Sequence, residues 1–374
     1  MNVVYPDYYR DFRCIAGECP DTCCGGWKIS IDDRTWKTYR RQKGDWGRKL
    51  RRSMDRENRS FLLEGGFCPF LDEEKLCGIQ KRMGEKNLCR TCRDYPRHME
   101  VYDGLKEVSL SLSCPEAARL ILKREKPPAL IKKEIPGEER TGKLLELLLE
   151  ARGEMFGLLD DRSLPYGLGC GMALAIAHDM QSRLDRESLG EARRLLRYAV
   201  SEKARQEAEK KTAVFYGRPE ERRQYMAAWM EVLGGLETIS ASWPERRVHC
   251  LSFLQDRSAY EKTHEKFLEY REKNRYVFAN LMIYFLYVYF LGAVYDGNVY
   301  GKAKFAAVSC LAVQAMSEAV LAEKGELSED DLIEAAYIYS REMEHSDNNL
   351  EGVEEILMKS GLFSMEKIFV CLFS

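Results

Sequence analysis

Cysteines are crowded into the N-terminal third of this 374-residue chain, and they constrain how that part can fold more than any other feature does. Nine of the thirteen cysteines occur within the first 114 residues, namely Cys14, Cys19, Cys23, Cys24, Cys68, Cys77, Cys89, Cys92 and Cys114. Thiolates bind metals, and several of them must converge on one ion or cluster. We therefore expect a metal centre in this region rather than a core of buried free cysteines.

The start of the chain indicates the redox environment of these thiols. The segment MNVVYPDYYRDF has neither the basic start nor the continuous apolar run of a signal peptide. Without export the cysteines meet a reducing cytosol, where disulfides are disfavoured and metal ligation is the better interpretation. The sequence therefore predicts a cytoplasmic protein whose thiols bind metal.

Spacing ranks the cysteines as ligands. Two residues separate Cys89 from Cys92, and this spacing lets one loop supply two ligands. The neighbours Cys23 and Cys24 would point in opposite directions in an extended segment, so that one ligates while the other packs or serves a second site. We expect the metal ligands among Cys19, Cys23, Cys24, Cys89, Cys92 and Cys114, and we rank Cys14, Cys68 and Cys77 below them.

The type of metal stays open at this level. Zinc takes four ligands in a tetrahedral site, and a 4Fe–4S cluster also takes four cysteines. Nine thiols exceed one such site, so either some are structural or there are two sites. His98 is the only histidine in the first 125 residues, which favours ligation by thiolates alone.

The sequence changes character near residue 125. Cysteines, glycines and short extended segments dominate before it, and long helical patterns follow it. Paired prolines and clustered charges at 126–138 are typical of a linker. We predict an α+β protein, with a small cysteine-rich metal-binding domain at 1–125 and a mainly α-helical domain at 139–374.

Local signals place several elements. Residues 27–32 alternate apolar and polar side chains, which predicts a strand, and Asp32 or Asp33 can cap a helix after it. Asp103-Gly104 lies between two strand-like segments and indicates a hairpin. Pro115 suits the first position of a helix that follows Cys114.

The second part shows apolar residues at three- and four-residue spacing almost throughout, as amphipathic helices do. Residues 188–211 and 248–273 each look like one continuous helix. Residues 279–295 carry no charge, but this run is short for a bilayer span and contains Asn280 and Gly292. We therefore expect a buried bundle helix there and no membrane span.

Charge is balanced overall, with a net charge of −2, but it is segregated locally. Residues 34–59 hold 11 Lys or Arg and three acids, and residues 326–356 hold 11 Asp or Glu and one Arg. Solvated helix faces explain both. A docking role is the alternative, in which Glu329, Asp330, Asp331 and Glu334 attract a lysine-bearing partner. The small net charge argues against nucleic acid or membrane as a general partner.

Three segments carry a resemblance to a known family. They are PDYYRDFRCIAGECPDTCCGGWKISID, CPFLDEEKLCGIQKRMGEKNLCRTCRDYPR and EVSLSLSCPEAARLIL. Together they resemble the flagellin lysine N-methylases and, more distantly, small cysteine-rich domains described as zinc or iron chelators. The motifs cover about the first 125 residues, and the helical remainder is similar to these methylases in length and character.

The resemblance implies an activity and its cofactors. The reaction would be methyl transfer from S-adenosylmethionine to lysine side chains of flagellin, in the cytoplasm before export. The metal centre would be a 4Fe–4S cluster, with zinc as the alternative. No Gly-x-Gly-x-x-Gly segment follows a strand, so no residue is assigned to the methyl donor, and the acceptor of the amine proton is equally unassigned.

Two other classes of function remain open. One is a metal-binding or redox-sensing protein without methylase activity. The other is an iron–sulfur protein that binds nucleic acid through residues 34–59, where Trp36, Tyr39 and Trp46 are interleaved with the basic residues. For the methylase, Tyr284, Tyr287, Tyr289 and Tyr295 could form an aromatic wall for a methylated ammonium, although core packing is the preferred explanation.

Overall fold

A computed structural model of the chain describes residues 1–136 and 142–374. It is 66% helical with a small mixed sheet, in agreement with the predicted α+β class. The helices of the larger part are α5 (Pro115–Leu122), α6 (Lys143–Asp160), α7 (Tyr166–Leu184), α8 (Leu189–Ala199), α9 (Glu202–Thr212), α10 (Pro219–Leu233), α11 (Trp243–Gln255), α12 (Arg257–Lys273), α13 (Arg275–Tyr289), α14 (Ala293–Asp296), α15 (Val299–Lys324), α16 (Glu329–Glu344), α17 (Asp347–Lys359) and α18 (Met365–Phe373). We call this part the helical body.

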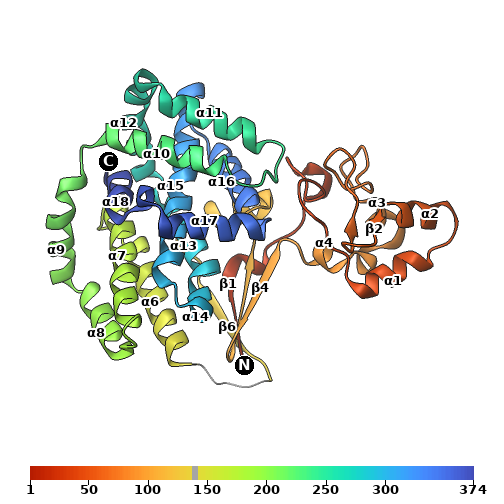
Figure 1. Cartoon of the computed structure of the whole chain (residues 1–374), viewed down its shortest axis with the longest axis horizontal. Helices are drawn as coiled ribbons and strands as arrows, with labels where there is room; N and C mark the ends of the chain where they lie inside the picture. Colours follow the sequence, from red (N-terminus) through yellow and green to blue (C-terminus); the bar gives the residue numbers. More distant parts are fainter. Residues whose placement is uncertain (137–141) are drawn as a thin grey trace.

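A four-stranded sheet covers one side of the helical body (Figure 1). Its strands, in spatial order, are β4 (Arg97–Tyr102), β5 (Leu105–Leu110), β1 (Asn2–Pro6) and β6 (Leu130–Glu134). β1 runs parallel to β5 and antiparallel to β6, while β4 and β5 form a hairpin. The predicted Asp103-Gly104 turn is confirmed, and Gly104 takes a φ of 72°, which glycine adopts without steric cost.

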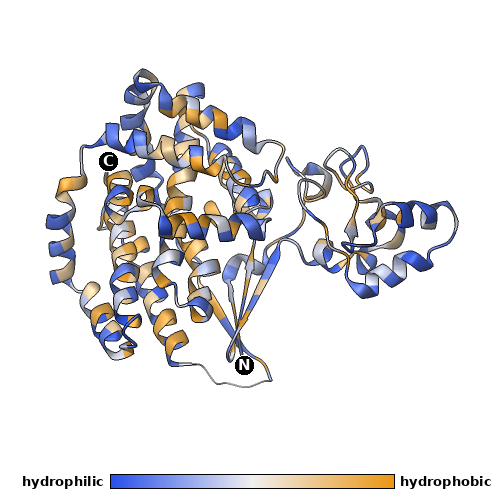
Figure 2. Cartoon of the chain, in the orientation of Figure 1, coloured by the Kyte–Doolittle hydropathy of each residue, from blue (hydrophilic) through white to orange (hydrophobic). Residues whose placement is uncertain are grey.

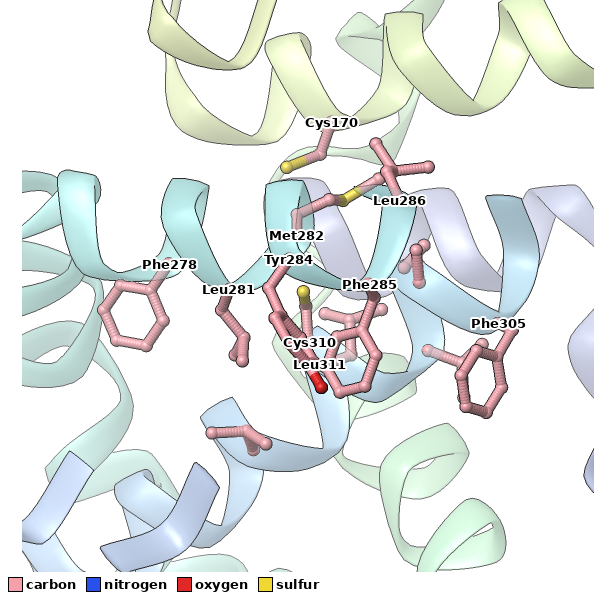
Figure 3. Close-up of a cluster of buried hydrophobic side chains, with 14 of the residues drawn as sticks. Cys170, Phe278, Leu281, Met282, Tyr284, Phe285, Leu286, Phe305, Cys310 and Leu311 are labelled. Atoms are coloured by element: carbon pink, nitrogen blue, oxygen red, sulfur yellow. The ribbon is translucent and has the colours of Figure 1, made fainter. Parts of the chain in front are cut away.

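The centre of the helical body is the helix pair α13 and α15. Both helices are apolar on nearly every face, which is the pattern of helices enclosed by others. Figure 3 shows Tyr284 and Phe285 of α13 among Cys310 and Leu311 of α15, with Cys170 of α7 on the opposite side of α13. All five side chains are at most 2% exposed, so this packing contributes much of the hydrophobic stabilisation of the body.

The apolar run at 279–295 begins in the core helix α13, as expected, and continues through a short turn into α14, where Tyr295 is exposed. Two helical stretches are long and apolar enough to cross a membrane by length and composition, Arg275–Asp296 and Val299–Lys324. Of their most apolar windows, 83% and 94% are buried inside the protein. Core helices of this kind pass the same test.

A smaller unit with its own core stands beside the helical body (Figure 1). Its core residues run from Ile29 to Cys89 and include Trp36, Tyr39 and Leu50. Its elements are α1 (Asp33–Arg41), α2 (Gly44–Arg52), β2 (Met54–Asp55), β3 (Ser60–Phe61), α3 (Gly78–Met83) and α4 (Arg90–Asp94). We call residues 14–95 the cysteine module.

The two cores divide the chain differently from the predicted boundary at residue 125. Residues of β5 and α5, such as Leu110 and Ile121, belong to the same core as the later helices. Residues 130–134 of the predicted linker pair with β1 as strand β6, while positions 137 and 138, and the start of the second domain at 139, lie outside the described residues. The cysteine module is thus an insertion between β1 and β4 of the sheet.

The structure confirms two local expectations and corrects two others. Asp32 caps α1 as predicted, because its carboxylate accepts a hydrogen bond from the backbone N–H of Thr35 at 3.0 Å. The strand predicted at 27–32 is reduced to one bridge between Ser30 and Ser60. A helix begins at Pro115, as expected. The two long stretches that were predicted as continuous helices are each broken, and Ser201 and Asp256 cap the helices that follow the breaks.

Candidate functional site

Cysteines from distant parts of the sequence surround one cavity of about 400 Å³ between the cysteine module and the helical body. Seven of the nine N-terminal cysteines line it, namely Cys14, Cys19, Cys23, Cys24, Cys77, Cys92 and Cys114. Five of these belong to the six preferred ligands. Cys89 and Cys68 are buried and do not line the cavity, although Cys89 contacts the thiol of Cys92.

The cavity wall is held by contacts within the cysteine module and by contacts between the module and the helical body. The backbone N–H of Cys68 donates to the carbonyl of Cys24 at 2.6 Å, which fixes the first cysteine group against the second. Arg341 of α16 pairs with Asp21 and donates to the carbonyl of Ser113 at 3.2 Å. These bonds bring a loop, a helix start and a distant helix to one place.

Close approach of the cysteine loop to the helical body requires a glycine at position 26. Gly26 has a φ of 83°, and a Cβ there would lie 2.4 Å from the carbonyl oxygen of Ile239. A side chain is excluded both by the backbone conformation and by the contact. Gly26 therefore lets the loop after Cys24 lie directly on the segment between α10 and α11.

The thiols are grouped in contacting pairs. A hydrogen bond to Cys24, assisted by burial, raises the pKa of Cys23, so these two side chains meet and the expectation that they point apart is wrong. They lie in a turn rather than an extended segment, which explains the difference. A hydrogen bond from Cys92 lowers the pKa of Cys89, while the same bond raises the pKa of Cys92. Burial raises the pKa of Cys114 to about 12.

The cavity is lined by thiols and has a cationic rim. Arginines contribute to its wall from four different elements or loops, namely Arg13, Arg93, Arg97 and Arg341. Guanidinium groups near thiols favour the thiolate form that binds metals. In residues 1–136 and 142–374, no three or more His, Cys, Asp or Glu side chains are close enough together to hold one metal ion.

A second hollow, of about 790 Å³, adjoins the cysteine cavity. The two share Tyr95, Pro96 and Arg97 as a common wall. Rings from both units line the second hollow, namely Trp27, Tyr95, Tyr102, Tyr289 and Tyr295, together with His98 and His345. We call this hollow the aromatic cleft.

The end of α16 supplies the polar floor of the aromatic cleft. His345 lies 4.6 Å from Trp27 and 5.7 Å from Tyr95 between ring centroids, and its Nε2 shares a hydrogen bond of 2.8 Å with Ser113. Burial, assisted by Arg341, lowers the pKa of His345 to about 3, so the ring is neutral at physiological pH. Glu344 lies beside it and lines the same cleft.

These two residues were not singled out from the sequence. Glu344 is one of the 11 acids of the stretch 326–356, but the expected docking acids were four others in that stretch. Glu329 and Asp330 pair with Lys123, at 3.4 and 3.2 Å. Asp331 caps α16 and pairs with Lys324 at 2.5 Å, so these acids are occupied by structural contacts.

The four tyrosines suggested as an aromatic wall lie in two different places in the structure. Tyr284 and Tyr287 are 2% and 4% exposed and pack in the core, which confirms core packing for them. Tyr289 and Tyr295 line the aromatic cleft instead. Tyr295 is stacked on Tyr102 at 5.8 Å between ring centroids.

The basic stretch 34–59 lies on α1 and α2, which Figure 2 shows as mainly hydrophilic. Its aromatic residues do not form a stacking surface for bases. Trp36 and Tyr39 are buried in the module core, and Trp46 packs edge-on against Phe70 at 5.4 Å. The stretch is therefore a solvated basic face without exposed tryptophan or tyrosine platforms.

Comparison with known proteins points to one family. A family model described as the FliB lysine N-methylase C-terminal domain matches residues 152–371. A lysine-N-methylase of Salmonella typhimurium is 36% identical over 144 residues, and the match covers 36% of this chain and 36% of that relative. The flagellar biosynthetic protein FliU of Salmonella muenchen is 37% identical over 131 residues, which are 33% of this chain and 78% of that protein. No solved structure matches the chain.

Proposed function

Because this chain belongs to the family of the FliB lysine N-methylases, we propose that it transfers methyl groups from S-adenosylmethionine to lysine side chains of flagellin, with a 4Fe–4S cluster bound by its N-terminal cysteines. The matched region lies within the helical body. The names of its relatives, a lysine-N-methylase and a flagellar biosynthetic protein, agree with a lysine substrate and with a flagellar one. The reaction would take place in the cytoplasm, before flagellin is exported.

One observation carries the proposal. A cavity lined by seven cysteines shares a wall with a cleft lined by aromatic rings. The first offers ligands for a metal centre, and the second suits an alkyl chain that ends in a cation, because aromatic faces attract ammonium groups. Two chemically different sites that adjoin at Tyr95 fit a transfer between two bound substrates.

The residues of the cysteine cavity suit an iron–sulfur cluster in chemistry and in room, although within residues 1–136 and 142–374 no three of them lie close enough together to hold one metal ion. Thiolates are the protein ligands that such clusters take, and about 400 Å³ is far more than a single ion fills. We propose Cys19, Cys23, Cys24, Cys92 and Cys114 as the ligand pool, with Cys14 and Cys77 next to them. A cluster with one iron not bound by cysteine would offer a position for the amino and carboxylate groups of the methyl donor.

The chain itself would orient the donor and shield it from water. Arg341 is 4% exposed, lines the cysteine cavity, and its Nε has no hydrogen-bond partner among the described residues. A buried guanidinium N–H that lacks a partner is costly, and a carboxylate would satisfy it. Arg341 is therefore placed to hold an anionic group in the cavity.

Purification without oxygen, followed by iron, sulfide and zinc analysis, tests the metal centre. We expect brown protein with near-stoichiometric iron and sulfide, and colourless protein that contains only zinc would overturn the cluster. The matched variants are Cys23→Ala, in the cavity, and Cys310→Ala, whose thiol is fully buried in the helical core. The first should lose iron and the second should keep it.

Incubation of the anaerobic protein with S-adenosylmethionine and purified flagellin tests the activity. Mass spectrometry of the flagellin should show added methyl groups on lysines in the presence of the wild-type protein and none with Cys23→Ala. Iron-loaded protein that binds neither the donor nor flagellin would instead support a metal-binding or redox-sensing protein without methylase activity.

A further inference from the structure

Glu344 is a carboxylate without an ion-pair partner at the floor of the aromatic cleft. Its Oε2 accepts hydrogen bonds from the Tyr284 hydroxyl at 2.7 Å and the Ser111 hydroxyl at 3.2 Å, and its Oε1 accepts one from the Ser340 hydroxyl at 2.8 Å. Within residues 1–136 and 142–374 it forms no ion pair. Its position is therefore fixed by three neutral donors.

Such a carboxylate is unusual inside a protein. Transfer of a charged group out of water is costly unless a partner of opposite charge compensates it. Burial accordingly raises the pKa of Glu344, and the hydroxyl donors and the nearby His98 oppose this only in part. A cationic ligand in the cleft would supply the missing compensation.

Other charges around the cleft are mostly paired with one another. Arg90 pairs with Asp94 at 3.4 Å, and His98 pairs with Glu100 at 3.3 Å. Lys302 pairs with Asp296 at 3.0 Å and also with Glu354. Lys106, Arg97 and Asp347 complete the charged lining. Glu344 thus stands apart as a half-buried carboxylate that hydroxyl groups hold and that forms no ion pair among the described residues.

The surroundings of Glu344 suit an alkyl ammonium in particular. Tyr289 and His345 lie on the same cleft wall, and Trp27 and Tyr95 flank His345. Aromatic faces pack against a methylene chain and attract the charge at its end. A neutral His345 adds no repulsion to an incoming cation.

We propose that the aromatic cleft binds the target lysine side chain and that Glu344 is the group that holds its ε-ammonium and accepts a proton from it. This inference rests on the proposed methylase function. The proton moves from Nζ to a carboxylate oxygen of Glu344, and the resulting neutral amine attacks the methyl carbon of the donor. The bond between that carbon and the sulfonium sulfur breaks, and its electron pair leaves with the sulfur as a neutral thioether.

A binding experiment tests the ammonium site without turnover. The probes are Nα-acetyl-lysine N-methylamide and its uncharged counterpart, Nα-acetyl-norleucine N-methylamide, titrated into the anaerobic full-length protein and followed by calorimetry. Wild-type protein should prefer the lysine probe. Glu344→Gln should bind it about ten-fold more weakly and lose the preference. Glu150→Gln, on the surface of α6, is the matched control.

A kinetic experiment tests the proton acceptor. Glu344→Gln should lower kcat/KM for flagellin at every pH between 6 and 9, with unchanged iron content and unchanged affinity for S-adenosylmethionine. Tyr284→Phe keeps the packing ring but removes one donor to Glu344, so it should shift the pH at which turnover rises. This milder variant keeps the test informative if Glu344→Gln fails to fold.

The outcomes separate this inference from the proposed function. If Glu344→Gln binds the lysine probe and methylates flagellin as well as the wild-type protein does, the role of Glu344 is overturned and the methylase function stays intact. Preferential binding of the lysine probe, lost in Glu344→Gln, would support the ammonium site even if the wild-type protein methylates no flagellin. That second result would overturn the proposed function alone.

Discussion

Glu342 shows how burial sets the charge of a carboxylate two positions before Glu344. It is fully buried and accepts hydrogen bonds from the backbone N–H groups of Ile239 at 3.0 Å and Ser240 at 2.9 Å. Burial outweighs these bonds and raises the pKa of Glu342 to about 7, and the nearby Glu237 adds to the effect. The folded protein therefore holds the proton of Glu342 more tightly than the unfolded chain does.

This raised pKa predicts a pH dependence of stability. An acid with a folded pKa of about 7 and an ordinary value of 4.5 contributes stability at low pH that is lost as the pH rises from about 4.5 to 7. Glu342→Gln removes the ionisation and keeps an oxygen acceptor. Between pH 5 and 8 the wild type should lose about 3 kcal/mol of unfolding free energy relative to the variant. Urea denaturation measures this, and parallel curves for the two proteins would contradict it.

For single residues, the sequence predicted which residue types form the candidate site better than it predicted which side chains contact one another. Clustered thiols pointed to the cysteine region, and five of the six preferred cysteines do surround one cavity. Cys89 is the exception, because its place in the module core depends on packing with residues far away in the chain. Glu344 could not be distinguished among 11 acids, since its hydroxyl partners come from three separate segments.

Among the elements, the start of α16 offers a test of what the acidic stretch does. Ser328 and Asp331 form a reciprocal capping box, in which each side chain accepts a hydrogen bond from the backbone N–H of the other residue. Asp331→Ala should therefore lower the unfolding free energy by about 1 kcal/mol, with turnover unchanged at low and high salt. Thermal denaturation and methyl transfer measure the two effects.

A neighbouring acid is the control for this prediction. Asp330 is exposed and pairs with Lys123 at the surface, so Asp330→Ala should change stability by less than about 0.5 kcal/mol. A salt-dependent loss of turnover in Asp331→Ala without a loss of stability would instead support a docking role for the stretch.

Elements set by local signals were predicted well, and pairings between distant segments were not. The turn at Gly104 and the helix start at Pro115 depend on the conformational preferences of a few adjacent residues. The breaks at Ser201 and Asp256 were missed, although both residue types favour helix caps. In contrast, β1 lies between β5 and β6, and no local pattern in residues 2–6 encodes that order.

For the whole molecule, two separate cores predict two responses to metal removal. The cysteine module has a small core, so bound metal should contribute a large share of its stability, whereas the helical body has an extensive core of its own. Chelation of the anaerobic protein should speed hydrogen exchange in residues 29–92 and leave α13 and α15 protected. Mass spectrometry of peptides measures this exchange.

The control for this prediction is Cys310→Ala, which perturbs the core of the helical body and not the module. It should speed exchange in the body while residues 29–92 keep their protection in the metal-loaded protein. Uniform acceleration across both units after chelation would show that they unfold together.

The two cores also explain why the change of sequence character near residue 125 misplaces the boundary. Composition records where cysteines end and helical patterns begin, but it does not record which apolar residues pack together. Tyr8, Leu110 and Ile121 precede residue 125 and nevertheless join the core of the helical body. Only the three-dimensional pairing of β1 with strands on both sides of it makes the module an insertion.

The position of β1 in the middle of the sheet has a consequence for how the protein is made. The strand leaves the ribosome before both of its neighbours, β5 and β6, which follow about a hundred residues later. During translation, the cysteine module can fold around its own core while β1 still lacks partners. If the cysteines bind the proposed cluster, its loading can therefore begin on the nascent chain, before the sheet closes and the cavity gains its wall from α16.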